Sequence, residues 1–439
     1  MINPLSPSGL LSPMLSSPGM REALSDRARL QRMLDFELAL ARAQAALGII
    51  PALAIDVIAN AARAEHYDLN ALGEEAQVCG NTAAPVLKAL AAQVAKTDAT
   101  AAAYVNFGAS RRDLIDTALV LDLRAAIDVL LGDLNRAVDG FTALAGRHRR
   151  TGTVGRAGLR HALPMPLGLK LAGYAAALAR SRDRLRRLRR EALVLQFGGE
   201  AGTLASLNER GLDVAERLAA LLDLPLPEAP WHSHRDRLAE TTCGFAILVG
   251  TCGKIARDLS LLMQTEVKEA LAPSVSAALA AATMVPNLAA AMLAAQVQEH
   301  ERGLDEWSPD ALIVPAIALA SSGALSAVVS AAEKLEIDSE RMRANIGATY
   351  GAVMAEPVVA ALSAKIGKEE ANRIVEEISI KALANKCDLQ DLLAHDERVR
   401  PHLSVGELAK LFEPMAYQGA AQTFIDRIVG ALHGRLGKR

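Results

Sequence analysis

The stretch from Ser110 to Arg149, SRRDLIDTALVLDLRAAIDVLLGDLNRAVDGFTALAGRHR, decides the fold class. Its apolar residues recur at spacings of three and four, which is the period of one face of an α-helix. A helix longer than about 25 residues is well above the average for globular proteins. A helix of this length indicates an extended helical bundle and argues against a compact globin-like fold.

Helical periodicity continues along almost the whole chain, and patterns typical of strands are nearly absent. An amphipathic helix is expected from Ser25 to Leu47, and a second one follows a turn at Gly80. Further long helices are expected from about Pro166 to Gln196, from about Arg237 to Ala270, in the uncharged run after Pro273, and from Ala311 to Leu335. The predicted fold is therefore all-α, with a long-helix central bundle (residues 108–337) flanked by smaller N-terminal (1–107) and C-terminal (338–439) helical domains.

Composition supports a helical cytoplasmic protein. Hydrophobic residues make up 51% of the chain and aromatic residues only 3%, so alanine and leucine supply the apolar bulk, which favours helices over sheet. The net charge of −2 gives no electrostatic reason to expect nucleic acid or an acidic membrane as a partner. The basic run at residues 179–190 fits the solvated face of a long helix. Four scattered cysteines without a CxxC pattern are typical of reduced thiols in the cytoplasm.

The run between Glu269 and Glu299 contains no charged residue. Its length would admit a membrane span. However, alanine dominates it, and five residues that are polar or break helices interrupt it: Ser274, Ser276, Pro286, Asn287 and Gln296. Alanine gains little from lipid, whereas small side chains let helices approach closely. We therefore expect a buried bundle helix here and no membrane partner.

Several segments together carry a resemblance to a known family. They are RLQRMLDFELALARAQAALGIIP (29–51), QFGGEAGTLASL (196–207), PWHSHRDRLAE (230–240), KIARDLSLLMQTEV (254–267) and QEHERGL (298–304). The chain resembles the fumarase/aspartase superfamily, which includes class II fumarase and adenylosuccinate lyase. Within it, the chain is most similar to the 3-carboxy-cis,cis-muconate cycloisomerases of aromatic catabolism, with a degenerate active site.

The resemblance implies a homotetramer whose active sites are each built from three chains. It also implies a small polycarboxylate substrate and no metal or other cofactor. The family chemistry moves a proton on the carbon next to a carboxylate, which requires cations and donors for a dianionic intermediate. It further requires an acid/base pair and a lid that excludes water. In the cycloisomerase branch, a substrate carboxylate closes onto a double bond to give a lactone.

The first family segment, G-x-T/S-S-x-D, stands here as GASRRD at residues 108–113. Ser110 takes the Thr/Ser position and Asp113 is retained, while Arg111 and Arg112 replace a serine and a glutamine. The spacing of Ser110 and Asp113 also predicts a capping box at the start of the long helix. Neighbouring residues on a helix point about 100° apart, so at most one of the two arginines can face a pocket squarely.

The second segment, T-x-x-Q-H, stands as GRAGLRHALP at residues 155–164. His161 is retained, whereas Ala157 and Arg160 replace the threonine and the glutamine. The resemblance implies that His161 transfers the proton, with Ser110 as its companion at the catalytic site. Guanidinium groups bind carboxylates through two hydrogen bonds. Arg111 or Arg112, together with Arg160 and Asp113, would therefore bind substrate, unless the arginines only pair with Asp113 and His161 only packs at a helix entry.

The third segment, the mobile loop GSSxMPxKxNP that carries the serine base, is absent. EVKEALAP (266–273) runs directly into SVSAALAAATMVPNL (274–288), and no other residue is evident as the base. The stretch QEHERGLDEWSPDAL (298–312) also departs from the family's W-H-x-E-W pattern. Either the protein lacks the loop or the printed sequence does, and the intact mass of the protein decides between the two.

Two smaller motifs have structural interpretations. His232 and His234 form an HxH without further ligands at a suitable spacing, so no metal site is expected. The glycines of QFGGEAG match no phosphate-binding spacing and predict a tight turn between helices. The sequence thus predicts a cycloisomerase-like enzyme. The alternatives are a diverged lyase acting on another succinate-type substrate, and a catalytically silent scaffold or partner subunit.

Overall fold

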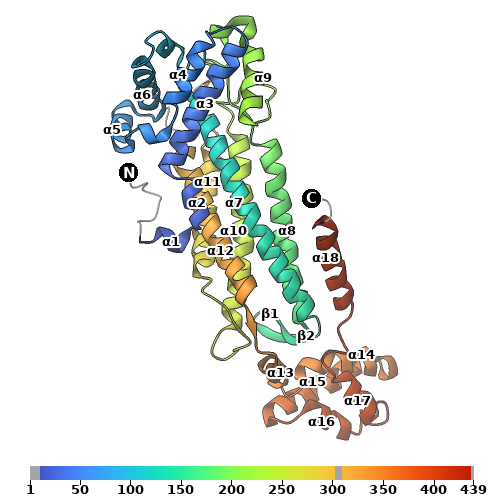
Figure 1. Cartoon of the computed structure of the whole chain (residues 1–439). Coiled ribbons are helices and arrows are strands. Elements are labelled where there is room, and N and C mark those ends of the chain that lie inside the picture. Colours follow the sequence, from blue (N-terminus) through green and yellow to red (C-terminus); the bar gives the residue numbers. More distant parts are fainter. Residues whose placement is uncertain (1–9, 302–308, 437–439) are drawn as a thin grey trace. The chain divides into compact units, whose positions relative to one another are not determined.

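The computed structural model describes residues 10–301 and 309–436, and these residues are mostly helical (Figure 1). The chain divides into two compact units. The first comprises Met1–Leu134, Arg180–Lys254 and Ser276–Val328, and the second comprises Asn135–Ala179, Ile255–Val275 and Val329–Arg439. Four long helices contribute residues to both units: α7 (Arg111–Arg147), α8 (Leu167–Glu191), α10 (Asp236–Leu262) and α12 (Asp310–Lys334). The all-α prediction is confirmed, and the three-domain division stays a prediction.

The first unit also contains the N-terminal helices and two later segments. Its further elements are α1 (Ser12–Leu15), α2 (Pro18–Ala23), α3 (Asp26–Ala46), α4 (Leu53–Ala61), η1 (Ala64–His66), α5 (Leu69–Cys79), α6 (Ala83–Ala95), η2 (Ala101–Tyr104), η3 (Ala205–Arg210), α9 (Gly211–Leu222) and α11 (Ser276–Ala294). Helix α3 begins where the Ser25 side chain accepts the Ala28 N–H at 3.2 Å, as an N-cap does. Helix α5 ends at Gly80, whose φ of +75° is the left-handed cap that glycine favours.

Small residues set the close approach of helices in the first unit. A Cβ added to Gly244 of α10 would lie 2.6 Å from Leu188 of α8. A Cβ added to Gly253 of α10 would lie 2.5 Å from the Ala282 Cβ of α11. Both distances are far inside van der Waals contact. A larger residue at Gly244 would have to displace the Leu188 side chain, and one at Gly253 would have to move the α11 backbone that carries Ala282. The alanine-rich composition therefore corresponds to tight helix packing, as the sequence predicted.

The two most apolar helices differ in burial. The most apolar window of α12 is 78% buried, whereas that of α11 is only 28% buried. The sequence analysis expected a buried helix in the uncharged run, and within one chain this expectation fails for α11. Met284 and Leu293 of α11 are 43% and 48% exposed. By length and composition alone, these two helices of the described chain could each cross a membrane.

The second unit contains two short antiparallel strand pairs and the C-terminal helices. Its further elements are β1 (Gly152–Ala157), β2 (Arg160–Pro166), β3 (Ala270–Leu271), β4 (Glu336–Ile337), α13 (Ser339–Gly347), η4 (Ala352–Met354), α14 (Ala355–Ile366), α15 (Lys368–Asn385), α16 (Leu389–His395), α17 (Val405–Leu411) and α18 (Ala421–Leu436). Strand β1 pairs with β2, and β3 pairs with β4.

Two features of the second unit differ from the sequence analysis. The β1–β2 hairpin was not expected; Gly158 and Leu159 connect its strands with φ values of +56° and +61°, the conformation of a two-residue type I′ turn. Helix α10 ends at Leu262 and does not continue to Ala270. The chain turns there because the Glu269 N–H donates back to the Leu262 carbonyl at 2.9 Å and Ala270 then enters β3.

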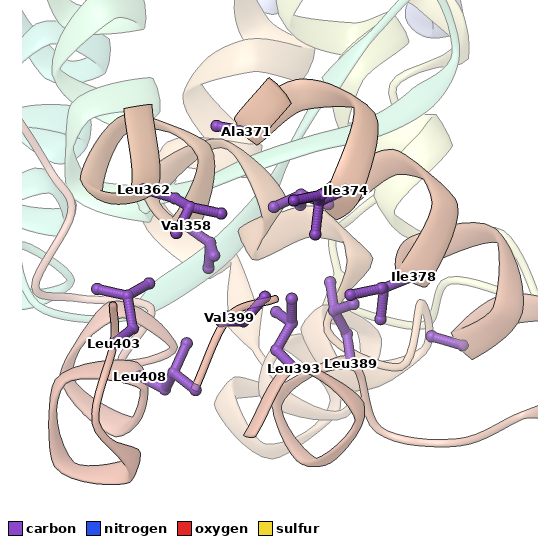
Figure 2. Packing of buried hydrophobic residues seen from close by; sticks show 12 residues of the cluster. Val358, Leu362, Ala371, Ile374, Ile378, Leu389, Leu393, Val399, Leu403 and Leu408 are labelled. Atoms are coloured by element: carbon purple, nitrogen blue, oxygen red, sulfur yellow. The ribbon is translucent and has the colours of Figure 1, made fainter. Parts of the chain in front are cut away.

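Helices α14 to α17 enclose a separate apolar core (Figure 2). Its buried members come from every one of these helices and the segments between them: Val358, Leu362, Ala371, Ile374, Val375, Ile378, Ala382, Leu389, Leu393, Val399, Leu403 and Leu408.

The Asp338 side chain accepts the Arg341 N–H at 2.8 Å and caps α13. Short helices therefore follow Asp338, as the sequence predicted for the C-terminal part.

Candidate active site

The start of α7 is closed by a reciprocal capping box. The Ser110 N–H donates to Asp113 Oδ2 at 2.8 Å, and the Asp113 N–H donates to Ser110 Oγ at 3.2 Å. This arrangement satisfies two of the N–H groups that a helix start leaves without intrahelical partners. The capping box predicted from the spacing is confirmed. Ser110 is only 3% exposed, because the preceding turn at Gly108 places it inside the first unit.

Asp113 ties the glycine-rich segment QFGGEAG to α7. Its Oδ1 accepts hydrogen bonds from Gln196 Nε2 and the Gly198 N–H, both at 2.9 Å. Its Oδ2 accepts the Gly199 N–H at 2.9 Å in addition to the Ser110 N–H. Burial raises the pKa of the Asp113 carboxyl, and these four donors oppose that rise. The glycines therefore form the turn that the sequence predicted, with Gly199 in the left-handed region at φ +69°.

Arg112 and Arg235 form a buried network with two aspartates. Arg112 Nε donates to Asp116 Oδ2 at 3.0 Å, one turn along α7. The Arg235 guanidinium also donates to Asp116, at 2.7 and 2.9 Å, and its Nε donates to Asp310 Oδ2 at 2.9 Å. Each of the four residues is 6% exposed or less. Two cations and two anions therefore neutralise one another inside the first unit.

The network holds its charges against burial. Burial pushes the pKa of Asp116 upward, but Arg235 and Arg112 outweigh it and hold that pKa below its usual range. Burial likewise lowers the pKa of Arg235, while Asp116 and Asp310 together raise it. The Arg235 guanidinium also lies over the Trp231 ring, 5.3 Å from its centre. Removing one partner would leave a buried charge uncompensated, which is strongly destabilising.

The adjacent arginines of α7 diverge as helical geometry requires. Arg112 is 6% exposed and turned toward Asp116, whereas Arg111 is exposed. Of the two predicted carboxylate clamps, Arg111 is thus exposed and Arg112 is buried against Asp116. This agrees with the expectation that the two residues cannot share one direction.

The hairpin of the second unit carries Arg160 and His161 at the start of β2. Both side chains are exposed, and their backbone partners on β1 are Ala157 and Arg156. Partial burial and the charge of Arg156 lower the pKa of His161, while Glu269 opposes them. His161 lies in a strand, and the packing alternative at a helix entry is not what the structure shows.

The predicted site residues thus fall into two groups. Ser110, Arg111, Arg112 and Asp113 share the start of α7 in the first unit, and Arg160 and His161 share the hairpin in the second. In the first group, Ser110 and Asp113 bind each other and Arg112 binds Asp116. Arg160 and His161 of the second group are exposed, as is Arg111 of the first, so these side chains are accessible to an anion from solvent.

The chain between β3 and α11 is short. Strand β3 ends at Leu271 and α11 begins at Ser276, so only residues 272–275 connect them. This is the place where the resemblance puts the loop with the serine base. Residues 302–308, which carry most of the other departure from the family pattern, lie outside the described residues.

Sequence reasoning missed the residues that support the site. Gln196, Asp116, Arg235 and Asp310 in the first unit, and Arg156, Glu269 and Asn345 in the second, were not singled out. Asp116 was detectable as a charged residue within an otherwise apolar helical stretch. The residues that the structure describes contain no group of three potential metal ligands. His232 is buried and His234 is exposed.

The family model described as "Lyase" matches residues 15–278, more than half of the chain. The chain belongs to this lyase family. The model for the adenylosuccinate lyase C-terminus matches residues 351–428, which contain the apolar core of Figure 2. The Lyase match ends shortly after the start of α11, just beyond the connection formed by residues 272–275.

Two relatives that are similar over nearly the whole chain carry the same enzyme name. The chain is 54% identical to a 3-carboxy-cis,cis-muconate cycloisomerase of Bradyrhizobium diazoefficiens, over 98% of this chain and 99% of the relative. It is 45% identical to an enzyme of the same name from Pseudomonas aeruginosa, over 94% of both chains. The crystal structure of the 3-carboxy-cis,cis-muconate lactonizing enzyme from Pseudomonas putida matches with a TM-score of 0.93 at 42% identity, covering 97% of this chain and 99% of that one.

Proposed function

We propose that the chain is a 3-carboxy-cis,cis-muconate cycloisomerase, which closes a carboxylated muconate to a lactone. The identity of 54% over nearly the whole chain to an enzyme of that name carries this proposal. In the reaction, a substrate carboxylate oxygen adds to a double bond and the neighbouring carbon takes a proton. Nothing is oxidised or reduced, so the residues of the protein need to supply only charge and proton transfer.

His161 supplies the proton in this proposal. The lowered pKa makes its protonated form a stronger acid than free imidazolium, which favours donation to carbon. The neutral ring then takes a proton back from solvent, because the side chain is exposed. Arg160, next to it on β2, and the exposed Arg111 bind substrate carboxylates. Ser110 and Asp113 hold the start of α7 in place through their capping box.

A homotetramer in the cytoplasm is part of the proposal. The support is α11, an apolar helix of 19 residues that is only 28% buried in one chain. A monomeric soluble protein rarely leaves such a surface uncovered. Copies of the same chain would cover it in a closed assembly.

A catalytically silent partner subunit is the second candidate. One observation favours it: residues 272–275 are the entire connection where relatives would carry the loop with the base. The aligned length of 450 positions with the Bradyrhizobium enzyme also exceeds the 439 residues of this chain, so that relative has residues for which this chain has no counterpart. A diverged lyase that acts on another succinate-type substrate is a further variant of the proposal.

The deciding experiment follows the diene absorbance of 3-carboxy-cis,cis-muconate mixed with the purified protein, whose intact mass is measured first. Loss of absorbance in the wild type, and at least tenfold slower loss in His161→Gln, supports the cycloisomerase. The proposal is contradicted if the wild-type protein has the mass of the 439-residue sequence and leaves the absorbance unchanged. In that case, calorimetric binding of the substrate separates a diverged lyase, which binds, from a silent subunit, which does not.

A further inference from the structure

Glu269 is a fully buried carboxylate in the second unit, placed between the end of α10 and β3. Its Oε1 accepts hydrogen bonds from Arg156 Nη2 at 2.6 Å and from Asn345 Nδ2 at 2.7 Å. Its Oε2 accepts Arg156 Nη1 at 2.9 Å. The arginine contact is therefore a two-pronged ion pair, the geometry in which guanidinium and carboxylate bind most strongly.

The backbone of Glu269 is fixed on both sides. Its N–H donates to the Leu262 carbonyl at 2.9 Å, and its carbonyl accepts the Asp338 N–H at 3.1 Å. Ala270, the next residue, pairs with Ile337 in the β3–β4 sheet. The carboxylate is thus attached to a rigid junction between α10, the small sheet and the start of α13.

Arg156 transmits this rigidity to the hairpin. It lies on β1 directly opposite His161, and its neighbour Ala157 lies opposite Arg160. The two-residue turn Gly158–Leu159 follows at once, so the exposed tip extends only a few residues beyond the clamped position. Asn345 belongs to α13, a helix that packs against β1. The carboxylate thus binds the hairpin and α13 together at the position of His161.

We propose that Glu269 is the positioning residue for the hairpin that carries Arg160 and His161. It acts through Arg156 and Asn345 and touches no substrate in this proposal. The inference deepens the proposed function and rests on it for the role of His161 in proton transfer. The contacts that carry it are independent of any activity.

The same arrangement sets the ionisation of His161. Within the described residues, the charged groups that shift the His161 pKa are Arg156, which lowers it together with burial, and Glu269, which raises it. Loss of the Glu269 charge would leave the Arg156 charge unopposed. The pKa of His161 would then fall further, and the hairpin would lose its clamp.

The test measures the ionisation of His161 by its reactivity. The full-length protein is treated with diethyl pyrocarbonate between pH 5 and 8, and the modification rate at His161 is followed by peptide mass spectrometry. In Glu269→Gln the midpoint should fall by about 0.5 pH unit or more, since an opposite charge nearby is removed. In Glu266→Gln, the same charge change three residues earlier at an exposed position, it should stay within about 0.2 unit of wild type. Equal midpoints in wild type and Glu269→Gln overturn the proposal.

A second variant separates positioning from general loss of structure. Arg156→Gln removes the cation that opposes protonation, so its His161 midpoint should rise above that of the wild type. Unfolding would bring both variants toward the ordinary histidine value, whereas the proposal requires opposite directions. If Glu269→Gln fails to fold by circular dichroism, Arg156→Gln carries the test once its own circular dichroism spectrum matches that of the folded wild type. An unchanged midpoint in this folded variant overturns the proposal. The modification test does not require catalytic turnover. If the protein shows both shifts in the His161 midpoint but lacks cycloisomerase activity, the proposed function is contradicted and the positioning role of Glu269 is supported.

Discussion

The start of α7 and the β1–β2 hairpin both carry an arginine in the candidate site, but the two arginines differ in burial and in their contacts. Each has arginine where relatives of this chain, by sequence resemblance, carry a small or amide side chain. At α7, Arg112 is buried and bound to Asp116, which a second arginine also holds. At the hairpin, Arg160 is exposed one residue after a tight turn. The comparison shows that an arginine in a candidate site can serve either the fold or an anionic ligand, and burial decides which.

The largest expected effect comes from disrupting the buried ion-pair network at the start of α7. Asp116→Ala leaves Arg112 and Arg235 without their shared carboxylate in a buried site, and should cost about 3–5 kcal/mol in the free energy of unfolding. Asp128 lies on the same helix as Asp116, but its ion pair with Arg189 of α8 is exposed. Asp128→Ala should therefore cost well under 1 kcal/mol. Urea denaturation measures both. Equal losses would show that burial does not distinguish the two ion pairs.

A second effect concerns Glu37 of α3, whose Oε2 accepts the Asn106 N–H at 2.8 Å, four residues before Ser110. Burial raises the pKa of Glu37 to about 8 from 4.5. The folded protein therefore holds this proton between those values while the unfolded chain releases it, so stability falls as pH rises toward 8. Between pH 6 and pH 9, the free energy of unfolding of the wild type should fall by about 2–3 kcal/mol because of Glu37, since one pKa unit corresponds to about 1.4 kcal/mol. In Glu37→Gln this contribution should be absent.

The measurement for Glu37 is urea denaturation at pH 6 and pH 9. The exposed Glu65 provides a control, and Glu65→Gln should keep the pH dependence of the wild type. A variant Glu37→Gln that loses as much stability as the wild type over this range would refute the assignment of a neutral carboxyl.

A smaller effect compares two helix caps. Ser110→Ala leaves the buried Asp113 N–H without its acceptor, and should cost about 2 kcal/mol. Ser25→Ala removes the half-buried cap of α3, where water can replace the lost acceptor, and should cost about 1 kcal/mol. Thermal unfolding of the two variants tests the ranking. A larger loss in Ser25→Ala would contradict the view that the α7 start is the more buried of the two.

The smallest effect on stability belongs to the hairpin. Arg160→Ala should change the free energy of unfolding by less than about 0.5 kcal/mol because the side chain is exposed. The same variant should weaken calorimetric binding of the carboxylated muconate at least tenfold, which is about 1.4 kcal/mol. Arg112→Ala should do the reverse, with a large loss of stability. If the two variants behave alike, the distinction between a structural and a ligand-binding arginine fails.

Local rules predicted much of this fold. The period of apolar residues predicted the long helices, the spacing of Ser110 and Asp113 predicted their capping box, and Gly80 predicted a turn before the next helix. Each depends on residues close together in the chain. The resemblance to the lyase family, read from a few segments, also predicted the fold class correctly.

What sequence reasoning missed depends on distant partners. The direction of Arg112 follows from Asp116 and from Asp310, which lies far along the chain. The end of α10 at Leu262 and the burial of Glu269 follow from the hairpin and α13. Strands of six and seven residues joined by a two-residue turn gave no periodic signal strong enough to separate them from the helix that follows.

The contrast between α11 and α12 has a consequence for how the protein is made. Folding of one chain buries most of α12, whereas α11 stays mostly exposed until another copy covers it in the proposed assembly. Each newly synthesised chain then passes through an interval in which an uncharged helix faces water. The length of that interval depends on the concentration of other copies, because subunit assembly is concentration-dependent. Until assembly covers it, the exposed apolar helix makes the single chain prone to aggregation.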